Sequence, residues 1–211
     1  GLFVSLTSIE NARYSENGTT WTEVALPFAE QMKSLITGNN RFIAVSENQS
    51  RVASSLNGIT WSEVSLPLSA AWADGVYGGK FVIVATDTDT VVSSTDGVTW
   101  TESGIIPDDA GGLTSTLSTW TNITYGNGKY LAISSSDGAT ASSTDAITWV
   151  RHDEAISFNP DYIAYGANRF VAIAAADGES AYSFDGITWY TNSDTLSDLS
   201  SPAITFQPSN I

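Results

Sequence analysis

A seven-residue pattern that runs from serine to tryptophan occurs five times along the chain and constrains the fold more than any other feature. Its third copy reads Ser94-Thr-Asp-Gly-Val-Thr-Trp100, and the fourth position is glycine in every copy except one. The copies end at Trp21, Trp61, Trp100, Trp149 and Trp189, so consecutive tryptophans are 40, 39, 49 and 40 residues apart. A repeat near 40 residues with strand-forming residues is typical of a β-propeller, in which each repeat is one blade.

Each repeat predicts four short strands. The first two are apolar and partly β-branched, as expected for strands buried on both faces. The third leads into an Asn-Gly or Asp-Gly turn, a strong hairpin signal, and the fourth begins at the tryptophan. The predicted first strands are 35–37, 75–77, 123–125 and 163–165, and the predicted second strands are 41–45, 80–84, 129–133 and 169–173.

The two ends of the chain complete the count of strands. Residues 2–6 match a second strand with no first strand before them, and residues 203–206 match a first strand with nothing after them. Pairing these segments would remove two open sheet edges, which otherwise favour aggregation. We therefore predict an all-β, five-bladed propeller of four-stranded antiparallel blades, closed by the N- and C-terminal strands. It forms one domain, 1–211, with blades at 1–27 plus 203–211, 33–67, 74–107, 121–154 and 161–194.

The repeated hairpins resemble Asp-box repeats, also called bacterial neuraminidase repeats, over nearly the whole chain. Asp-box repeats occur in sialidases and in many non-catalytic propellers, and here Asp and Gly are adjacent where the usual box has one residue between them. The phrase Tyr125-Gly-Asn-Gly-Lys-Tyr-Leu-Ala-Ile133 is similar to propeller repeats of phage and bacterial surface proteins. The resemblance implies a non-catalytic propeller domain. We expect a structural role for the five repeat tryptophans and for Asp96, Asp145 and Asp185, whose side chains can bind turn N–H groups.

Charge and composition exclude several classes of partner and site. The net charge of −15 disfavours nucleic acids and anionic membranes. No apolar run approaches the ~20 residues of a membrane span, no signal peptide is visible, and the start at Gly1 indicates a processed chain or a fragment. The chain has no cysteine and a single histidine, which excludes disulfides and the usual protein-only zinc sites.

Enzymatic chemistry has weak support. A sialidase site needs clustered arginines, but Arg41 and Arg169 occupy a recurring position beside a turn, and Arg13, Arg51 and Arg151 fall on different repeats. A Ser-His-Asp arrangement around His152 and Asp153 lacks a nucleophile elbow, whereas a two-carboxylate glycoside hydrolase remains an alternative because the chain has 23 acidic residues. We predict that the protein is not an enzyme and name no catalytic residue.

No cofactor is predicted, and calcium is left open. Oxygen ligands suitable for calcium occur in the loops between second and third strands. None of these loops reproduces a known calcium motif, so we expect solvated turn acids. The residues are Asp87, Asp89, Asp137, Asp177 and Glu179.

Two tryptophans outside the repeat column mark the candidate ligand site. Trp72 and Trp120 each lie five residues before a first-strand tyrosine, and Asp74 and Asn122 follow them by two residues. Exposed aromatic rings beside carboxylates and amides suit sugars, although both rings could instead pack beneath loops. We add Asp161, which follows the proline at the same slot of the last repeat. We expect these residues on the face that also carries the long loop 104–119.

The function predicted from the sequence is therefore a non-catalytic binding module for a glycan or a cell-surface receptor, in a phage tail or another surface appendage. An assembly propeller that binds other proteins of a virion or surface complex is the alternative. Either role predicts an extracellular or virion location, without nucleic-acid binding or membrane insertion.

Overall fold

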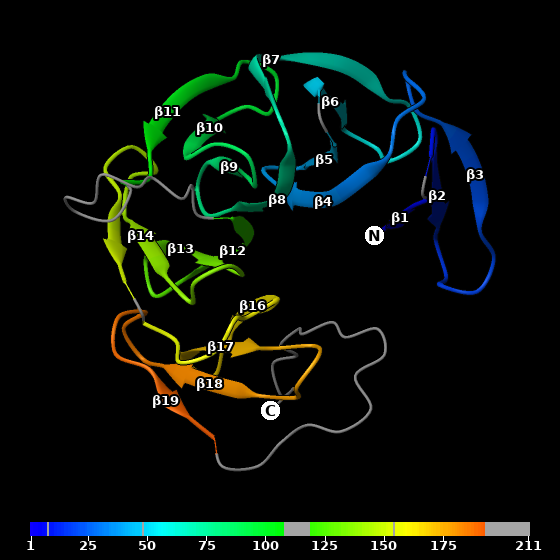
Figure 1. Cartoon of the computed structure of the whole chain (residues 1–211). Helices are drawn as coiled ribbons and strands as arrows, with labels where there is room; N and C mark the ends of the chain where they lie inside the picture. Colours follow the sequence, from blue (N-terminus) through cyan, green and yellow to red (C-terminus); the bar gives the residue numbers. More distant parts are fainter. Residues whose placement is uncertain (8, 48, 108–118, 154, 193–211) are drawn as a thin grey trace.

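Five antiparallel β-sheets form the fold (Figure 1). The computed structural model describes residues 1–7, 9–47, 49–107, 119–153 and 155–192. These residues contain no helix, and so none that could cross a membrane. The first sheet contains β1 (Phe3–Leu6), β2 (Asn11–Ser15) and β3 (Thr22–Ala25), and the second contains β4 (Met32–Gly38), β5 (Arg41–Ser46), β6 (Gln49–Ser55) and β7 (Ser62–Ala70). The third sheet contains β8 (Trp72–Tyr77), β9 (Phe81–Ala85), β10 (Thr90–Ser94) and β11 (Thr101–Ile105), and the fourth contains β12 (Trp120–Gly126), β13 (Lys129–Ser134), β14 (Thr140–Ser143) and β15 (Val150–His152). The fifth sheet contains β16 (Tyr162–Gly166), β17 (Arg169–Ile173), β18 (Ser180–Ser183) and β19 (Tyr190–Thr191).

The sheets are arranged around a common centre as the blades of a propeller. In each of the last four blades the strands follow one another in sequence order, and β4, β8, β12 and β16 lie innermost (Figure 1). The inner strands of consecutive blades contact one another. The predicted all-β fold with four-stranded antiparallel blades is confirmed, and five sheets fit five blades. The structure shows no closed sheet: the first blade has three described strands, and residues 203–206, predicted to close it, lie outside the described residues.

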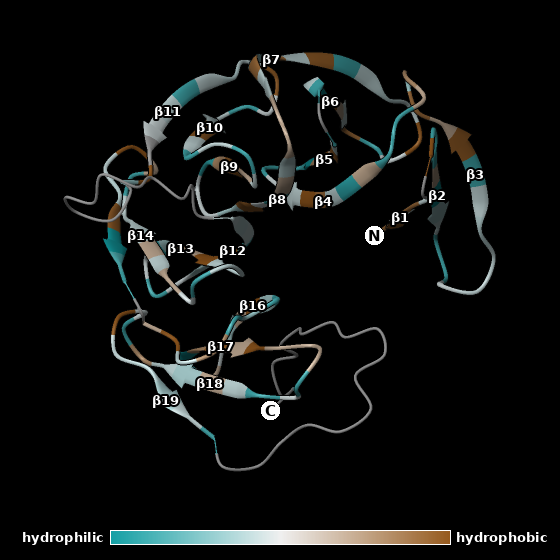
Figure 2. Ribbon diagram, viewed as in Figure 1, coloured by the Kyte–Doolittle hydropathy of each residue, from teal (hydrophilic) through white to brown (hydrophobic). Residues whose placement is uncertain are grey.

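Apolar side chains fill the space between neighbouring blades. The second strands β5 and β13 are mainly buried on both faces, and in β9 every residue is buried, whereas β1 is partly exposed. Hydrophobic and hydrophilic bands alternate along the outer strand β7, which has only one face toward the core (Figure 2). A single cluster joins the second and third blades: it contains Ile43 and Val52 of one together with Phe81 and Trp100 of the other.

The repeated hairpin is held by its own side chains, as predicted. In all five copies the serine Oγ accepts a hydrogen bond from the backbone N–H three residues later, at 2.8–2.9 Å. The Asn or Asp Oδ1 accepts the N–H groups two and three residues later, at 2.7–3.0 Å. These bonds satisfy turn N–H groups that no strand pairing reaches, so the side chains of Asp96, Asp145 and Asp185 hold their own turns.

The same bonds predict how stability depends on pH. Backbone N–H groups, first that of Thr99, lower the pKa of Asp96 to about 2. The N–H of Thr148 does the same for Asp145, whose pKa also lies at about 2, and the N–H of Ile187 lowers the pKa of Asp185. A carboxylate whose folded pKa is lowered stabilises the fold above its unfolded pKa of about 3.9, and that stability is lost as the pH falls toward 2.

We therefore expect the free energy of unfolding, measured with urea, to fall between about pH 4 and pH 2. The matched variant combines Asp96→Asn, Asp145→Asn and Asp185→Asn, because asparagine occupies this position in the first two hairpins. The variant should keep the hairpins and lose less stability than the wild type over this interval. Identical pH profiles for the two proteins would contradict the account.

The five tryptophans of the repeated hairpins form the tryptophan column. They are buried in the middle blades and exposed in the first blade. Trp61, Trp100 and Trp149 are buried and Trp189 is partly buried. The prediction is wrong for Trp21, which is 42% exposed. Each of the other four rings packs against the sheet of the preceding blade. No described sheet precedes the first blade, so nothing comparable covers Trp21.

Where neighbouring inner strands meet, a glycine of one strand faces a tyrosine of the next. A Cβ placed on Gly38 would overlap the ring of Tyr77 in the next blade, and the same holds for Gly78 against Tyr125 and for Gly126 against Tyr165. Each of these tyrosines also lies against an aromatic ring of its own second strand, with centroids 4.7–4.8 Å apart. A glycine at the end of one inner strand thus makes room for the aromatic residue of the next.

Candidate functional site

Trp72 and Trp120 do not offer ring faces to a ligand. Their exposed fractions are 1% and 0%. The indole N–H of Trp72 donates to the backbone oxygen of Gln49 at 2.7 Å, and that of Trp120 donates to Asp89 Oδ1 at 3.0 Å. Each ring therefore packs against the preceding blade, and the expectation of exposed sugar-stacking rings is wrong because the start of an inner strand is covered by its neighbour.

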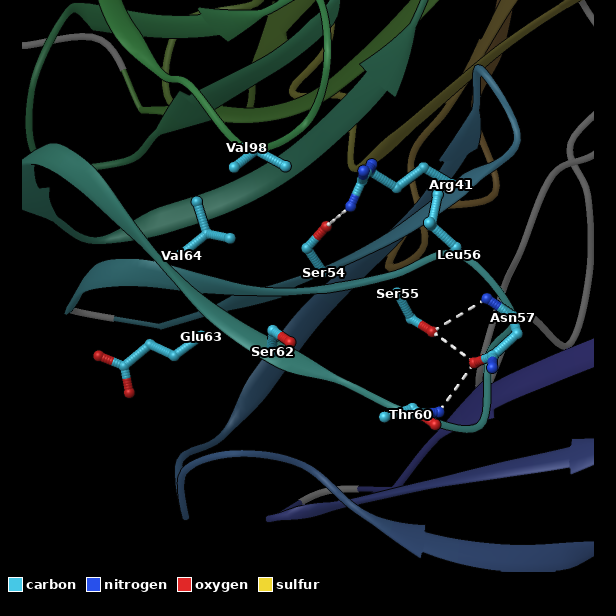
Figure 3. Close-up of a pocket in the computed structure, with 10 residues that line it drawn as sticks. All are labelled: Arg41, Ser54, Ser55, Leu56, Asn57, Thr60, Ser62, Glu63, Val64 and Val98. Carbon is cyan, nitrogen blue, oxygen red and sulfur yellow. Dashed lines mark hydrogen bonds between the residues drawn. The ribbon is translucent and has the colours of Figure 1, made fainter.

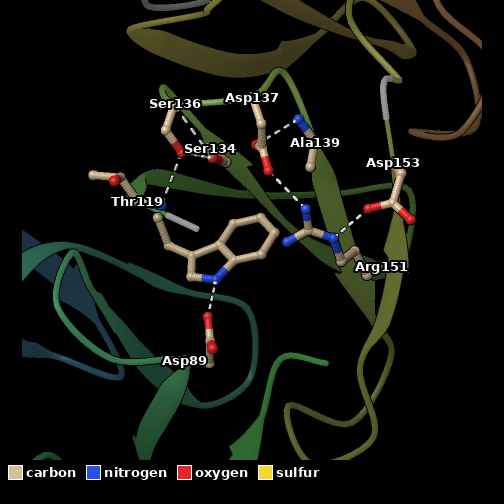
Figure 4. A network of polar contacts seen from close by, with 9 residues as sticks. Asp89, Thr119, Ser134, Ser136, Asp137, Ala139, Arg151 and Asp153 are labelled. Carbon is tan, nitrogen blue, oxygen red and sulfur yellow. Dashed lines mark hydrogen bonds and ion pairs between the residues drawn. The ribbon is translucent and has the colours of Figure 1, made fainter. Parts of the chain in front are cut away.

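Arg151 lies over the indole of Trp120 and is the centre of a network of polar contacts (Figure 4). The Arg151 guanidinium lies 5.6 Å from the indole centroid and donates to Asp137 at 2.6 Å, with a second bond to Asp153. Asp137 also accepts the N–H of Ala139. The arginine joins the outer strand β15 to the loop before β14, which makes this network a structural one.

Three of the acids considered for calcium accept hydrogen bonds that hold the fold. Asp87 accepts the N–H of Ala71, and Asp89 and Asp137 have the partners given above. Within the described residues, no group of three or more His, Asp or Glu side chains is placed to hold a metal ion.

Polar side chains link the inner strands around the centre of the ring. Ser34 Oγ donates to Asp74 Oδ1 at 2.7 Å, and Asp74 Oδ2 accepts Asn122 Nδ2 at 2.8 Å and the N–H of Ile123 at 3.1 Å. Asn122 Oδ1 in turn accepts the N–H of Ile163 at 3.0 Å. Four consecutive inner strands are joined in this way by side chains rather than by strand pairing.

Asp74 contributes the carboxyl group to this chain of contacts. Burial raises the pKa of Asp74 above its ordinary value, against hydrogen bonds from Ser34 Oγ and from the N–H groups of Ile123 and Gly75, which lower it. Both of its oxygens accept bonds from protein donors. The group therefore holds neighbouring strands together and presents little free acceptor capacity to a ligand.

A pocket of about 350 Å³ opens beside Asp74, bordered by all four described inner strands. Four of the five residues predicted for the ligand site line it, namely Trp72, Asp74, Asn122 and Asp161, whereas Trp120 does not. Asp161 Oδ2 accepts the N–H of Ala175 at 2.6 Å. The remaining lining residues, which the sequence analysis missed, are Lys33, Glu47, Ala71, Ala73, Thr86, Thr121 and Tyr162.

β-Bulges explain why some of these residues face the pocket. The pairing of three inner strands skips one residue each, at Lys33, Ala73 and Thr121. A bulge re-aims the side chain of the extra residue, and all three line the pocket. Thr121 Oγ1 is buried and has no hydrogen-bond partner among the described residues, so its hydrogen-bonding capacity is unused.

Charges in the pocket are mixed but mainly acidic. Lys33 Nζ lies 3.0 Å from Glu47 Oε1, so these two charges offset each other. Asp74 and Asp161 are the remaining acids. The only histidine, His152, lies on the outer strand β15 within 3.3 Å of Ser142 Oγ, and burial and the charge of Lys129 lower its pKa. It does not belong to the pocket.

Comparisons with known proteins agree with the architecture. Residues 4–113 match the family model described as the DUF6242 beta propeller domain. The chain belongs to this family. No match was found among curated proteins.

Solved structures similar to this member of the DUF6242 family include virginiamycin B lyase from Staphylococcus aureus, with a TM-score of 0.74 at 14% identity, covering 88% of this chain and 64% of the lyase. YCF48 bound to D1 peptide has a TM-score of 0.63 at 17% identity, covering 90% of this chain and 61% of YCF48. YCF48 from Cyanidioschyzon merolae has a TM-score of 0.64 at 12% identity, covering 90% and 71%. The chain spans less than two thirds of the first two, and at these identities the likeness concerns the fold alone.

Proposed function

We propose that the protein is a non-catalytic binding module that takes one sugar residue of a glycan, or of a glycosylated receptor, in the pocket between the inner strands. The observation that carries the proposal is the set of polar groups around this pocket of about 350 Å³. Small-ligand sites are concave and use a few placed polar groups for specificity. The proposal places the module on a phage tail, a virion or another extracellular surface, following its resemblance to repeats of surface proteins.

The polar groups suit hydroxyls better than a charged ligand. The Thr121 hydroxyl can donate or accept once its side chain rotates toward the ligand, the Asp161 carboxylate accepts, and the Tyr162 hydroxyl does both. Sugar hydroxyls supply matching donors and acceptors. With Trp72 and Trp120 buried, we infer recognition by hydrogen bonds rather than by ring stacking.

We further propose that residues 203–206 complete the first blade, which would add a fifth wall to the site. In sequence, Phe206 corresponds to Tyr77, Tyr125 and Tyr165, so it would lie opposite Phe3 and against Gly166. Gln207 then corresponds to the inner-strand glycines, and the residue it would meet is Thr37, which is smaller than tyrosine. The size match seen between the other blades would therefore continue around the ring.

Binding of a protein partner is the second candidate. The first blade exposes Phe3, Ile9 and Trp21, and the similar YCF48 structure contains a bound D1 peptide. A hydrolase role is less favoured: both oxygens of Asp74 already accept bonds from protein donors, which leaves this carboxyl poorly placed to transfer a proton to a glycosidic oxygen.

A glycan array probed with the whole chain, followed by titration calorimetry with the strongest glycan, tests the proposal. Thr121→Val removes a hydroxyl without breaking a described bond and should weaken binding about three- to tenfold. Thr124→Val is the matched control, because Thr124 lies on the same strand and does not line the pocket. Equal affinity of the wild type and Thr121→Val, or equal losses in the two variants, would contradict the proposal.

A further inference from the structure

A second pocket, of about 450 Å³, lies on the hairpin side of the ring between the second and third blades (Figure 3). Strands β6 and β7 contribute Ser54 and Ser62, and their connecting turn contributes Leu56, Asn57 and Thr60. Arg41 borders one side and Val98 of the next hairpin another (Figure 3). None of these residues lines the central pocket.

Arg41 differs from the residues at the same position of the next two blades. Lys80 Nζ donates to the backbone oxygen of Asp145 at 3.1 Å, and Lys129 Nζ donates to that of Asp185 at 2.8 Å. Each lysine thereby fastens the hairpin of the following blade.

Arg41 does not make the corresponding bond. Asn39 Nδ2 donates to the third hairpin at Thr95 O, as Asn127 Nδ2 of the fourth blade donates to the fifth hairpin at Phe184 O. Arg41 instead turns toward its own blade and donates from Nη1 to Ser54 Oγ at 2.7 Å. A guanidinium has five N–H donors, and the described residues use one of them here, so a planar fork of donors faces the pocket.

Small side chains on the second blade keep this space open. The fifth blade carries Tyr182 and Tyr190 where the second carries Ser54 and Ser62, and those two rings stack with centroids 5.4 Å apart. In the fifth blade the arginine of the same slot, Arg169, lies over Tyr182 at 5.4 Å. Rings and arginine occupy in the fifth blade the position that is a pocket in the second.

We propose that this pocket binds the carboxylate of an acidic sugar, a uronate, at Arg41. Arginine pairs with carboxylates through two parallel N–H···O bonds, which gives both strength and orientation. The hydroxyls of Thr60 and Ser62 and the Asn57 amide are suited to the ring hydroxyls. Leu56 and Val98, both exposed, offer apolar contacts to the C–H face of the sugar. The site is separate from the one proposed for the main function.

The carboxylate of Glu63 is expected to weaken the binding of a uronate to this pocket. It lines the same pocket, and its carboxylate lies 3.2 Å from Arg51 Nη1. Like charges oppose each other, so Glu63→Gln should tighten the binding of a uronate. A neutral sugar would not respond to this change.

Titration calorimetry with sodium glucuronate, glucose and N-acetylalanine as probes tests the inference. We expect glucuronate to bind more tightly than either of the other two, because only it combines a carboxylate with sugar hydroxyls. Arg41→Gln should weaken glucuronate binding about tenfold or more. Ser62→Tyr copies the fifth blade at an exposed position and should abolish binding by filling the pocket, whereas Thr101→Tyr, the same change on the third blade, should leave it intact.

Several results would overturn the inference. One is the absence of glucuronate binding to the wild type, and another is unchanged binding in Arg41→Gln with a native circular dichroism spectrum. Glucose binding as tight as glucuronate binding would show that the carboxylate is not recognised. Equally tight binding of N-acetylalanine would show that the sugar ring is not recognised. Thr121→Val should leave glucuronate binding unchanged, so that failure here is distinguishable from failure of the central site.

Discussion

Replacing Trp100 by alanine is expected to lower the free energy of unfolding by about 3–5 kcal/mol, because the change empties a buried position between two blades. The ring is 7% exposed and packs with Val52, Val64 and Phe81. Urea denaturation followed by circular dichroism measures the effect. A loss below about 1 kcal/mol, far under the usual cost of such a substitution, would mean that the tryptophan column does not carry the packing between blades.

Two variants serve as controls for this prediction. Trp100→Phe should cost less than the alanine variant, since most of the buried ring is kept and the indole N–H has no hydrogen-bond partner among the described residues. Trp21→Ala should cost less as well, because that ring is 42% exposed. Equal losses in Trp21→Ala and Trp100→Ala would contradict the difference in burial that the structure gives.

A disulfide between Ser5→Cys and Ile204→Cys is expected to form and to stabilise the fold by up to about 5 kcal/mol in the loop-entropy model, because it closes a loop of nearly the whole chain. The proposed pairing of Phe206 with Phe3 would place residues 204 and 5 directly opposite in an antiparallel ladder. Opposite Cα atoms are then about 4.5–5.5 Å apart, within the range of a disulfide. The chain has no cysteine of its own, so any bond formed is the designed one.

The matched control combines Ser5→Cys with Thr205→Cys. Neighbouring residues of a strand point to opposite faces, so this pair should stay reduced. Thiol titration and a melting temperature measured with and without reductant distinguish the two proteins. A free Ser5/Ile204 cysteine pair under oxidising conditions, or equal cross-linking in both double variants, would contradict closure in this register.

The repeated hairpin was predictable because its structure is local. The serine and the Asn or Asp of each copy bind N–H groups within three residues, so the sequence pattern contains every partner needed. Burial of the tryptophan is not local, since it depends on the blade that precedes it. That is why Trp100 matches the prediction and Trp21 does not.

The candidate site was predicted in part, and for a reason that the structure does not support. The sequence predicts Asp74 and Asn122 as neighbours of exposed indoles, but Trp72 and Trp120 are buried, and the two polar residues instead bind one another across blades. Thr121 was missed because a β-bulge leaves no signature in residue types. The packing of one blade on the next, which no single repeat encodes, decides which side chains reach the centre.

The contacts of Arg41 were also not predictable from the sequence alone. The sequence identifies a recurring basic position beside the turn between first and second strands, and Lys80 and Lys129 use it to hold the next hairpin. Arg41 departs from this role and donates to Ser54 of its own blade. Only the structure shows which of these basic residues has N–H donors that bind no other part of the chain that the structure describes.

The most direct test of the central claim is a crystal structure of the whole chain soaked with the glycan that binds most strongly on the array. The account predicts density for one sugar residue within hydrogen-bonding distance of Thr121 Oγ1 and of the Asp161 carboxylate. Density for that glycan elsewhere on the molecule, with the pocket between the inner strands holding none of it, would contradict the account.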